Sequence, residues 1–180
     1  ASNEPISRLE RGYGDTADKV TASSAAVIRG MQDVGVASSA KHFPGIGRTT
    51  TNTDLGIAHD TVTTGTADEL AAFRGAIDAG VSSVMISSVV YDQIDAQHPA
   101  VFSSVVMNDL LRGRLGYRGV VVSDDLGVAK AVAAVPSAER GTRFLLAGGD
   151  LVTNVDKASV AAMVKDTSAK AQNDEAFAGQ

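Results

Sequence analysis

The sequence predicts a parallel α/β fold, in which amphipathic helices alternate with short buried strands. Three observations support this prediction. Stretches with helical spacing of apolar residues alternate with short apolar runs, and the links between them are brief. The apolar runs are unbroken, which is typical of parallel strands covered on both faces. The pattern alone is equally compatible with a doubly wound open sheet and with part of a barrel.

The first helix is predicted over residues 16–34, where apolar side chains recur on one helix face. Gly35 follows it and suits the left-handed conformation that often ends a helix. A small strand over residues 36–40 then runs into Lys41. The second helix is predicted over residues 67–79, again with its apolar residues on one face.

The second strand is predicted over residues 81–87, where three large apolar residues are consecutive. A helix over residues 104–114 and a glycine-containing turn lead to the third strand, over residues 120–123. The fourth strand, over residues 150–153, follows a helix over residues 137–147 and a Gly-Gly turn.

The last helix is predicted over residues 156–171, and the polar tail from Gln172 is expected to fray. Asp150, which ends the Gly-Gly turn, is expected to have a structural role.

The composition excludes several classes of function. A net charge of −5 and a pI near 5.1 argue against a nucleic-acid partner, because binding phosphates requires clustered Lys and Arg. No apolar run approaches the roughly 18 residues of a membrane span. Without cysteine the chain has no disulfide and no thiolate metal site, and the redox compartment stays open.

Polar side chains are concentrated at the predicted carboxyl ends of three strands, the edge that carries the working residues of parallel α/β folds. The three loops span residues 41–47, 87–91 and 123–126. They supply a Lys-His pair, a hydroxyl-rich segment and a double aspartate. Together these groups are suited to surround a polar ligand.

These loops resemble a known family. Residues 41–47 read KHFPGIG and are similar to the KHFPGHG signature of family 3 glycoside hydrolases, of the β-N-acetylglucosaminidase kind. Residues 120–126 read VVVSDDL and resemble the strand of that family whose first aspartate attacks the sugar. Three further segments resemble family motifs in the same order along the chain: residues 3–14, 99–119 and 147–150. The resemblance implies parallel (β/α) units that form about half of a TIM-type (β/α)8 barrel.

The resemblance also implies roles for individual residues. Asp124 would be the catalytic nucleophile, while Arg11, Lys41 and His42 would hold the sugar. A retaining glycosidase needs an ionised carboxylate below the anomeric carbon, and neighbouring Arg and Lys would keep it ionised and donate to sugar hydroxyls. Neither task requires a metal or an organic cofactor. Asp125 is expected instead to accept hydrogen bonds from backbone N–H groups of a following helix.

The loop after this signature departs from the family pattern. The family carries an Asp-Ser-His triplet there, whose histidine is the acid/base. In an ungapped alignment the triplet falls on Asn52, Thr53 and Asp54. Ile46 also replaces the second histidine of the signature. Asp54 is therefore predicted to be the acid/base, if burial or Asp–Asp repulsion raises its pKa, with His59 on the same mobile loop as the alternative.

The chain is shorter than a complete barrel, which typically takes about 250 residues. The acidic sugar-binding loop that precedes these motifs in the family is not in the sequence. Residues 1–180 are therefore expected to form a single (β/α) barrel domain, incomplete on its N-terminal side. An open half-barrel exposes two sheet edges, so the remainder of the barrel or a partner chain is expected to close the sheet.

The leading functional hypothesis is a retaining glycoside hydrolase that removes terminal β-linked N-acetylglucosamine from peptidoglycan fragments or similar glycans. The alternative is a non-catalytic sugar-binding or structural remnant, which the missing histidine and the incomplete barrel favour. A β-glucosidase-like family member is the third reading, although its acid is a glutamate of a second domain that this sequence lacks. The peptidoglycan link and the absence of cysteine favour the cell envelope or secretion over the cytoplasm.

Overall fold

The centre of the fold is a four-stranded parallel sheet whose strands follow one another in chain order. The computed structural model describes residues 6–179, so residues 3–5 of the N-terminal motif lie outside the described part. The strands are β1 (Ser39–Phe43), β3 (Ser83–Ile86), β6 (Val120–Asp125) and β7 (Leu151–Thr153). The order β1-β3-β6-β7 contains no reversal, and every pairing is parallel. This confirms the sequential arrangement of a partial barrel and excludes the doubly wound alternative.

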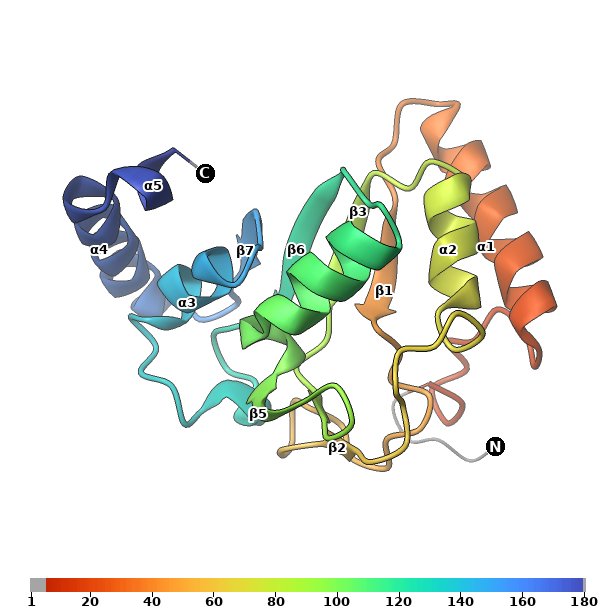
Figure 1. Ribbon diagram of the computed structural model, residues 1–180, viewed down its shortest axis with the longest axis horizontal. Helices are drawn as coiled ribbons and strands as arrows, with labels where there is room; N and C mark the ends of the chain where they lie inside the picture. Colours follow the sequence, from red (N-terminus) through yellow and green to blue (C-terminus); the bar gives the residue numbers. More distant parts are fainter. Residues whose placement is uncertain (1–5, 180) are drawn as a thin grey trace.

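The sheet is open, with β1 and β7 as its two edges (Figure 1). Figure 1 shows α1 and α2 beside β1 at one end of the sheet and α3 and α4 beyond β7 at the other. The helices are α1 (Ala17–Gln32), α2 (Ala71–Asp78), the π-helix η2 (Val105–Arg114), α3 (Arg140–Leu146), α4 (Lys157–Asn173) and α5 (Glu175–Ala178). Short 3-10 helices span η1 (Ala100–Phe102) and η3 (Lys130–Val132).

The ends of α1 follow from its flanking residues. The Thr16 hydroxyl accepts a hydrogen bond from the backbone N–H of Lys19 at 3.3 Å, which satisfies a free donor of the first turn. Gly35, just beyond the helix, has a φ of +79°, a conformation that glycine adopts without steric cost. The predicted start of this helix is therefore confirmed, whereas its end at Gln32 lies two residues before the predicted one.

The buried core lies between the helices and one face of the sheet. Val84 and Ile86 of β3 and Val121 of β6 are fully buried, and Leu111 of η2 and Phe144 of α3 cover them. Side chains alternate between the two faces of a strand, so on β6 Val120 and Asp124 lie on the face opposite Val121. The two adjacent aspartates at the end of β6 consequently point to different sides of the sheet.

A second, small sheet at the carboxyl ends of the main strands was not predicted. It consists of β2 (His59–Asp60), β4 (Val90–Tyr91) and β5 (Asp95–Pro99), in the order β2-β4-β5. Figure 1 places β2 and β5 at the end of the molecule toward which β1 points. Strands of two residues give no alternating pattern, so sequence periodicity could not reveal this sheet.

Two local predictions were wrong. In place of the helix expected to follow Asp125, residues 126–132 form a loop that ends in the 3-10 turn η3. The tail expected to fray from Gln172 instead continues α4 to Asn173 and then forms α5, where Phe177 is buried. A single apolar residue in a polar segment was too weak a signal for that helix, which tertiary packing stabilises.

Candidate active site

The Lys-His pair and the double aspartate occupy the ends of two strands separated by β3. Lys41 and His42 lie within β1, slightly earlier relative to the strand end than predicted, and Asp124 lies near the end of β6. The imidazole Nε2 of His42 is 4.0 Å from the carboxylate Oδ2 of Asp124. The two side chains therefore meet across the end of β3, at the edge where parallel α/β enzymes carry their chemistry.

His42 is held as a neutral imidazole. Burial, together with the positive charges of Lys41 and Arg11, lowers its pKa to about 4. Its Nδ1 atom is buried and has no hydrogen-bond partner within residues 6–179. A neutral imidazole beside an aspartate can donate one hydrogen bond to a ligand without adding a charge.

Burial dominates the electrostatics of Asp124. It raises the pKa of the carboxyl above its ordinary value, and the negative charge of Asp54 acts in the same direction. The positive charge of Lys41 and a 2.9 Å hydrogen bond from the backbone N–H of Asp125 to Oδ1 oppose this rise. The expected stabilisation of the carboxylate by Lys41 is therefore present, but in this chain burial outweighs it.

Arg11 reaches the site from the N-terminal segment. Its charge acts on His42, and it lines a cavity of about 710 Å³ together with Lys41 and His42. The rest of the lining comes from the N-terminal segment, from α1 and α2 and from residues 37–40, and Asp124 is not part of it. The cavity thus extends from the sugar-binding candidates on β1 to α1 and α2.

Asp125 has a structural role that differs from that of its neighbour. Its carboxylate accepts hydrogen bonds of 2.8–3.2 Å from four backbone N–H groups, those of Gly127, Val128, Ala129 and Val155. The expected acceptance from backbone N–H groups is confirmed, although the donors belong to the loops after β6 and β7 rather than to a helix. A Cβ at position 127 would clash with Asn154 and Asp156, so only glycine allows the two loops to approach this closely.

The two acid/base candidates lie in different surroundings. The charge of Asp54 acts on Asp124, and its loop is tied to the segment after β6 by a 3.2 Å bond from the Ala131 N–H to the Thr53 carbonyl. His59 lies instead in β2, where its imidazole Nδ1 is 2.8 Å from Oδ1 of Asp92. Of the two, only Asp54 is linked electrostatically to Asp124.

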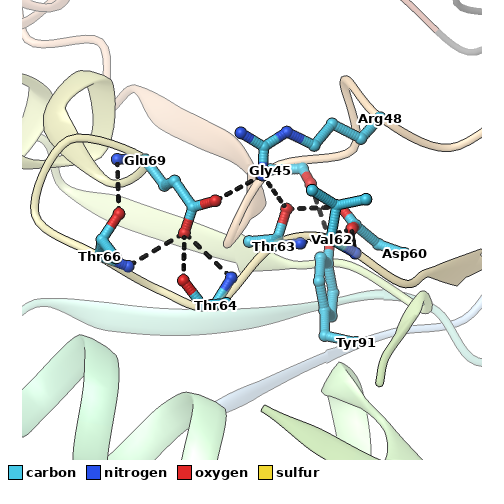
Figure 2. A network of polar contacts seen from close by, with 9 residues as sticks. All are labelled: Gly45, Arg48, Asp60, Val62, Thr63, Thr64, Thr66, Glu69 and Tyr91. Carbon is cyan, nitrogen blue, oxygen red and sulfur yellow. Dashed lines mark hydrogen bonds and ion pairs between the residues drawn. The ribbon is translucent and has the colours of Figure 1, made fainter. Parts of the chain in front are cut away.

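The segment that flanks this loop is anchored by the polar network of Figure 2. Arg48 forms an ion pair with Glu69 and donates to the Thr63 hydroxyl at 3.1 Å. The buried carboxylate of Asp60 accepts from the same hydroxyl at 2.6 Å and from the Thr63 N–H at 2.8 Å. The stretch between Arg48 and Asp60, which carries Asp54, is therefore held at both ends.

The structure adds three residues that sequence reasoning missed. Buried Arg140 donates to the carbonyls of Leu126 and Gly127 at 2.8 and 2.9 Å and so supports the loop after Asp125. Ser88, after β3, has a fully buried hydroxyl with no partner in the described chain. Asp92 binds His59. Only Ser88 belonged to a loop that the sequence had singled out, and neither of the others forms part of a recognisable motif.

Asp150 lies near the opposite ends of the strands, as its expected structural role requires. Its carboxylate accepts from the Val121 N–H and from Arg112, each at 2.7 Å. Residues 6–179 contain no group of three or more His, Asp or Glu side chains that could hold a metal ion. Within the same residues, no helix has the length and apolar character needed to cross a membrane.

Comparison with known proteins agrees with this geometry. The profile described as "Glycosyl hydrolase family 3 N terminal domain" matches residues 1–177. Proteins named beta-hexosaminidase are similar in sequence: one from Vibrio cholerae O395 is 38% identical over 157 residues, which are 87% of this chain and 47% of that protein. One from Stenotrophomonas maltophilia K279a is 40% identical over 144 residues, or 79% of this chain and 43% of that protein.

Solved structures give the same result. A beta-N-acetylhexosaminidase from Beutenbergia cavernae superposes with a TM-score of 0.94 at 44% identity, over 99% of this chain and 54% of that one. A family 3 beta-N-acetylglucosaminidase from Paenibacillus sp. str. FPU-7 gives 0.83 at 35% identity, over 89% of this chain and 31% of that one. The chain thus spans about half the length of the curated relatives it matches. With its parallel strand order and the residues gathered at its strand ends, the chain belongs to glycosyl hydrolase family 3 and comprises part of that family's N-terminal domain.

Proposed function

We propose that the protein is a retaining β-N-acetylhexosaminidase that removes terminal β-linked N-acetylglucosamine, with Asp124 as its nucleophile. The observation that carries this proposal is the meeting of Asp124 with His42, beside Lys41, at the carboxyl end of the sheet. The sugar class is supported by the names of the relatives, beta-hexosaminidase and beta-N-acetylglucosaminidase. Peptidoglycan fragments, which carry such terminal sugars, are the proposed source of substrate.

The geometry suggests how the first step would proceed. Oδ1 of Asp124 is occupied by the Asp125 N–H, so Oδ2, which faces His42, is the oxygen free to attack the anomeric carbon. As the bond from Oδ2 to carbon forms, the bond to the leaving oxygen breaks, and Asp54 donates a proton to that oxygen.

In the second step a water molecule attacks the same carbon. Ionised Asp54 accepts a proton from the water, and the bond to Asp124 breaks, which restores both carboxyl groups. Lys41, Arg11 and neutral His42 would donate hydrogen bonds to the sugar hydroxyls and hold the ring over Asp124. These steps use side chains of this chain alone.

Closure of the barrel is part of the proposal. The free edges of β1 and β7 would pair with further strands, supplied by the same polypeptide or by a partner chain. The cavity along β1 and the greater length of the relatives support this arrangement. On this view residues 1–180 are one (β/α) domain that is completed on its N-terminal side.

The test is the rate at which the natural full-length protein releases the aryl group from a chromogenic β-N-acetylglucosaminide. Asp124→Asn should abolish turnover, because an amide cannot form the glycosyl ester. Asp109→Asn, an equivalent change at an exposed position on η2, is the matched control and should retain the wild-type rate. Unchanged turnover in Asp124→Asn would exclude Asp124 as the nucleophile.

A further inference from the structure

The loop between β1 and β2, which carries the proposed proton donor, is closed across its base by one side chain. Arg48, near the start of the loop, forms an ion pair with Glu69 and donates to the Thr63 hydroxyl at 3.1 Å (Figure 2). Both partners follow β2 in the chain. The far end of the loop is fixed separately, because the buried carboxylate of Asp60 in β2 accepts from the Thr63 N–H at 2.8 Å. The contacts of Arg48 with Thr63 and Glu69, which we call the Arg48 bridge, therefore join the two ends of the loop.

Glu69 provides the bridge with an acceptor that is itself held in place. Its Oε1 atom accepts from Arg48, while Oε2 accepts from the N–H and hydroxyl of Thr64 at 3.0 and 3.1 Å and from the Thr66 N–H at 3.0 Å. Burial acts to raise the pKa of Glu69, but the bonds from Arg48, Thr66 and Thr64 outweigh it and lower the pKa to about 2. The carboxylate is therefore charged near neutral pH, and its second oxygen keeps it from turning to follow a moving arginine.

The tip of the loop is a hydrogen-bonded turn that contains Asp54. Oδ1 of Asn52 accepts from the Asp54 N–H at 3.0 Å, and the Asn52 carbonyl accepts from the Leu55 N–H at 3.0 Å. The Thr53 carbonyl accepts from the Ala131 N–H of η3, which follows β6, at 3.2 Å. The turn thus fixes Asp54 relative to its own loop, while the position of the turn in the site depends on the contact with η3 and on the base of the loop.

We propose that Arg48 is a positioning residue, which holds this loop so that Asp54 can protonate the leaving oxygen. The inference rests on the proposed function, in which Asp54 is the proton donor. A donor must lie within hydrogen-bond reach of the atom that it protonates, and a displacement of about 1 Å can cost roughly 10²-fold in rate. Arg48 acts through the loop and makes no contact with the sugar in this scheme.

The experiment compares kcat/KM of the natural full-length protein on two substrates. One is a disaccharide with a terminal β-linked N-acetylglucosamine, and the other is an aryl β-N-acetylglucosaminide whose phenol has a low pKa. The sugar leaving group depends on protonation far more than the phenol does. In Arg48→Met, which keeps an unbranched side chain without its donors, kcat/KM should fall about tenfold on the disaccharide and less than about twofold on the aryl substrate.

Two further variants control this comparison. Arg48→Lys can still pair with Glu69, so it should restore most of the disaccharide-to-aryl ratio. Arg143→Met is the matched control on α3, because Arg143 pairs with Glu139 and its side chain is 51% exposed, against 47% for Arg48. This variant should keep the wild-type ratio.

Glu69→Gln separates position from charge. Arg48→Met removes a positive charge and Glu69→Gln a negative one, so a direct effect of charge on the site would shift the ratio in opposite directions. Loss of the bridge lowers it in both, by about threefold in Glu69→Gln because an amide keeps weaker bonds, and the double variant should fall no lower than Arg48→Met alone. Opposite shifts, or an unchanged ratio in both variants, would overturn the inference while leaving the proposed function intact.

Amide hydrogen exchange provides a measurement that needs no substrate. Backbone amides of residues 49–58 should exchange faster in Arg48→Met than in the wild type, and at the wild-type rate in Arg143→Met. Unchanged exchange, or faster exchange with an unchanged disaccharide-to-aryl ratio, would also overturn the positioning role. If Asp54→Asn itself shows no dependence on the leaving group, the proposed proton donor is wrong and the inference fails with it.

Discussion

At the scale of single residues, Asp124 and Asp125 have opposite surroundings although they are adjacent. Burial raises the pKa of Asp124. Burial also acts to raise the pKa of Asp125, but the backbone N–H groups that donate to its carboxylate outweigh this and lower it. The alternation of side chains along β6 explains the difference, because it turns the two carboxylates to opposite faces. The carboxylate of Asp124 is therefore available to a ligand, whereas that of Asp125 accepts hydrogen bonds from the backbone.

The acid/base assignment is tested by leaving-group dependence. Asp54→Asn should slow hydrolysis of a sugar leaving group by roughly 10²–10⁴-fold and that of a low-pKa phenol much less, because a phenolate leaves with little protonation. His59→Gln should retain most activity on both substrates, since its imidazole is bound by Asp92. Steady-state rates on the two substrates provide the measurement. If His59→Gln instead of Asp54→Asn showed this leaving-group dependence, His59 would be the acid/base. If neither variant changed the rates, the proton donor would lie outside this loop.

At the scale of elements, periodicity predicted the four main strands and the helices between them, with boundaries displaced by a few residues. β1 was expected over residues 36–40 and is found at Ser39–Phe43, because Lys41 and His42 continue the strand as polar residues. Apolar runs indicate the buried part of a strand, so a strand that ends in a functional site extends beyond its apolar signal. The small sheet is defined by pairings between loops, which no local pattern encodes.

The position of the candidate site could be predicted from the sequence, but not all of its residues. The order of strand ends predicted that Lys41, His42 and Asp124 would lie together, and the structure brings them to one edge. The resemblance to a family, rather than any spacing, supplied the role of each residue. Arg140 could not have been found, because its acceptors are carbonyl groups of a loop whose shape the sequence did not reveal.

The loop after β6 provides a stability prediction. Asp125→Asn should lower the free energy of unfolding by about 2–3 kcal/mol, because an amide oxygen accepts fewer and weaker bonds from the four N–H groups. The pKa of Asp125 is lowered from its ordinary value by the backbone N–H groups that donate to it. Its contribution to the free energy of unfolding is therefore complete above the pKa of the unfolded state and is lost as the pH falls through the pKa of the folded state. Denaturant unfolding at neutral pH and in acid should show the variant and wild type converging in acid. A difference that does not depend on pH would contradict the role of the carboxylate charge.

At the scale of the whole molecule, the chain is an open arc whose inner face and edges are incompletely covered. Val120 and Leu151 lie exposed on adjacent strands, and β1 and β7 have unpaired edges in the described sheet. Exposed edges of this kind are normally paired or protected. The arc nevertheless contains both the proposed nucleophile and the proposed acid/base, so under the proposed function both groups that act in bond cleavage would come from this part of the barrel.

The proposed function depends on a covalent bond between Asp124 and the sugar, and this glycosyl-enzyme intermediate can be trapped. Asp54→Asn should accumulate the intermediate with an activated aryl β-N-acetylglucosaminide, because the leaving group departs without a proton while hydrolysis lacks its base. After acid quenching and proteolysis, mass spectrometry should find the peptide around Asp124 heavier by one N-acetylhexosaminyl group, with fragmentation placing the group on that residue. A sugar on Asp125 or on another residue, or product of inverted configuration with no adduct at any time, would exclude Asp124 as the nucleophile.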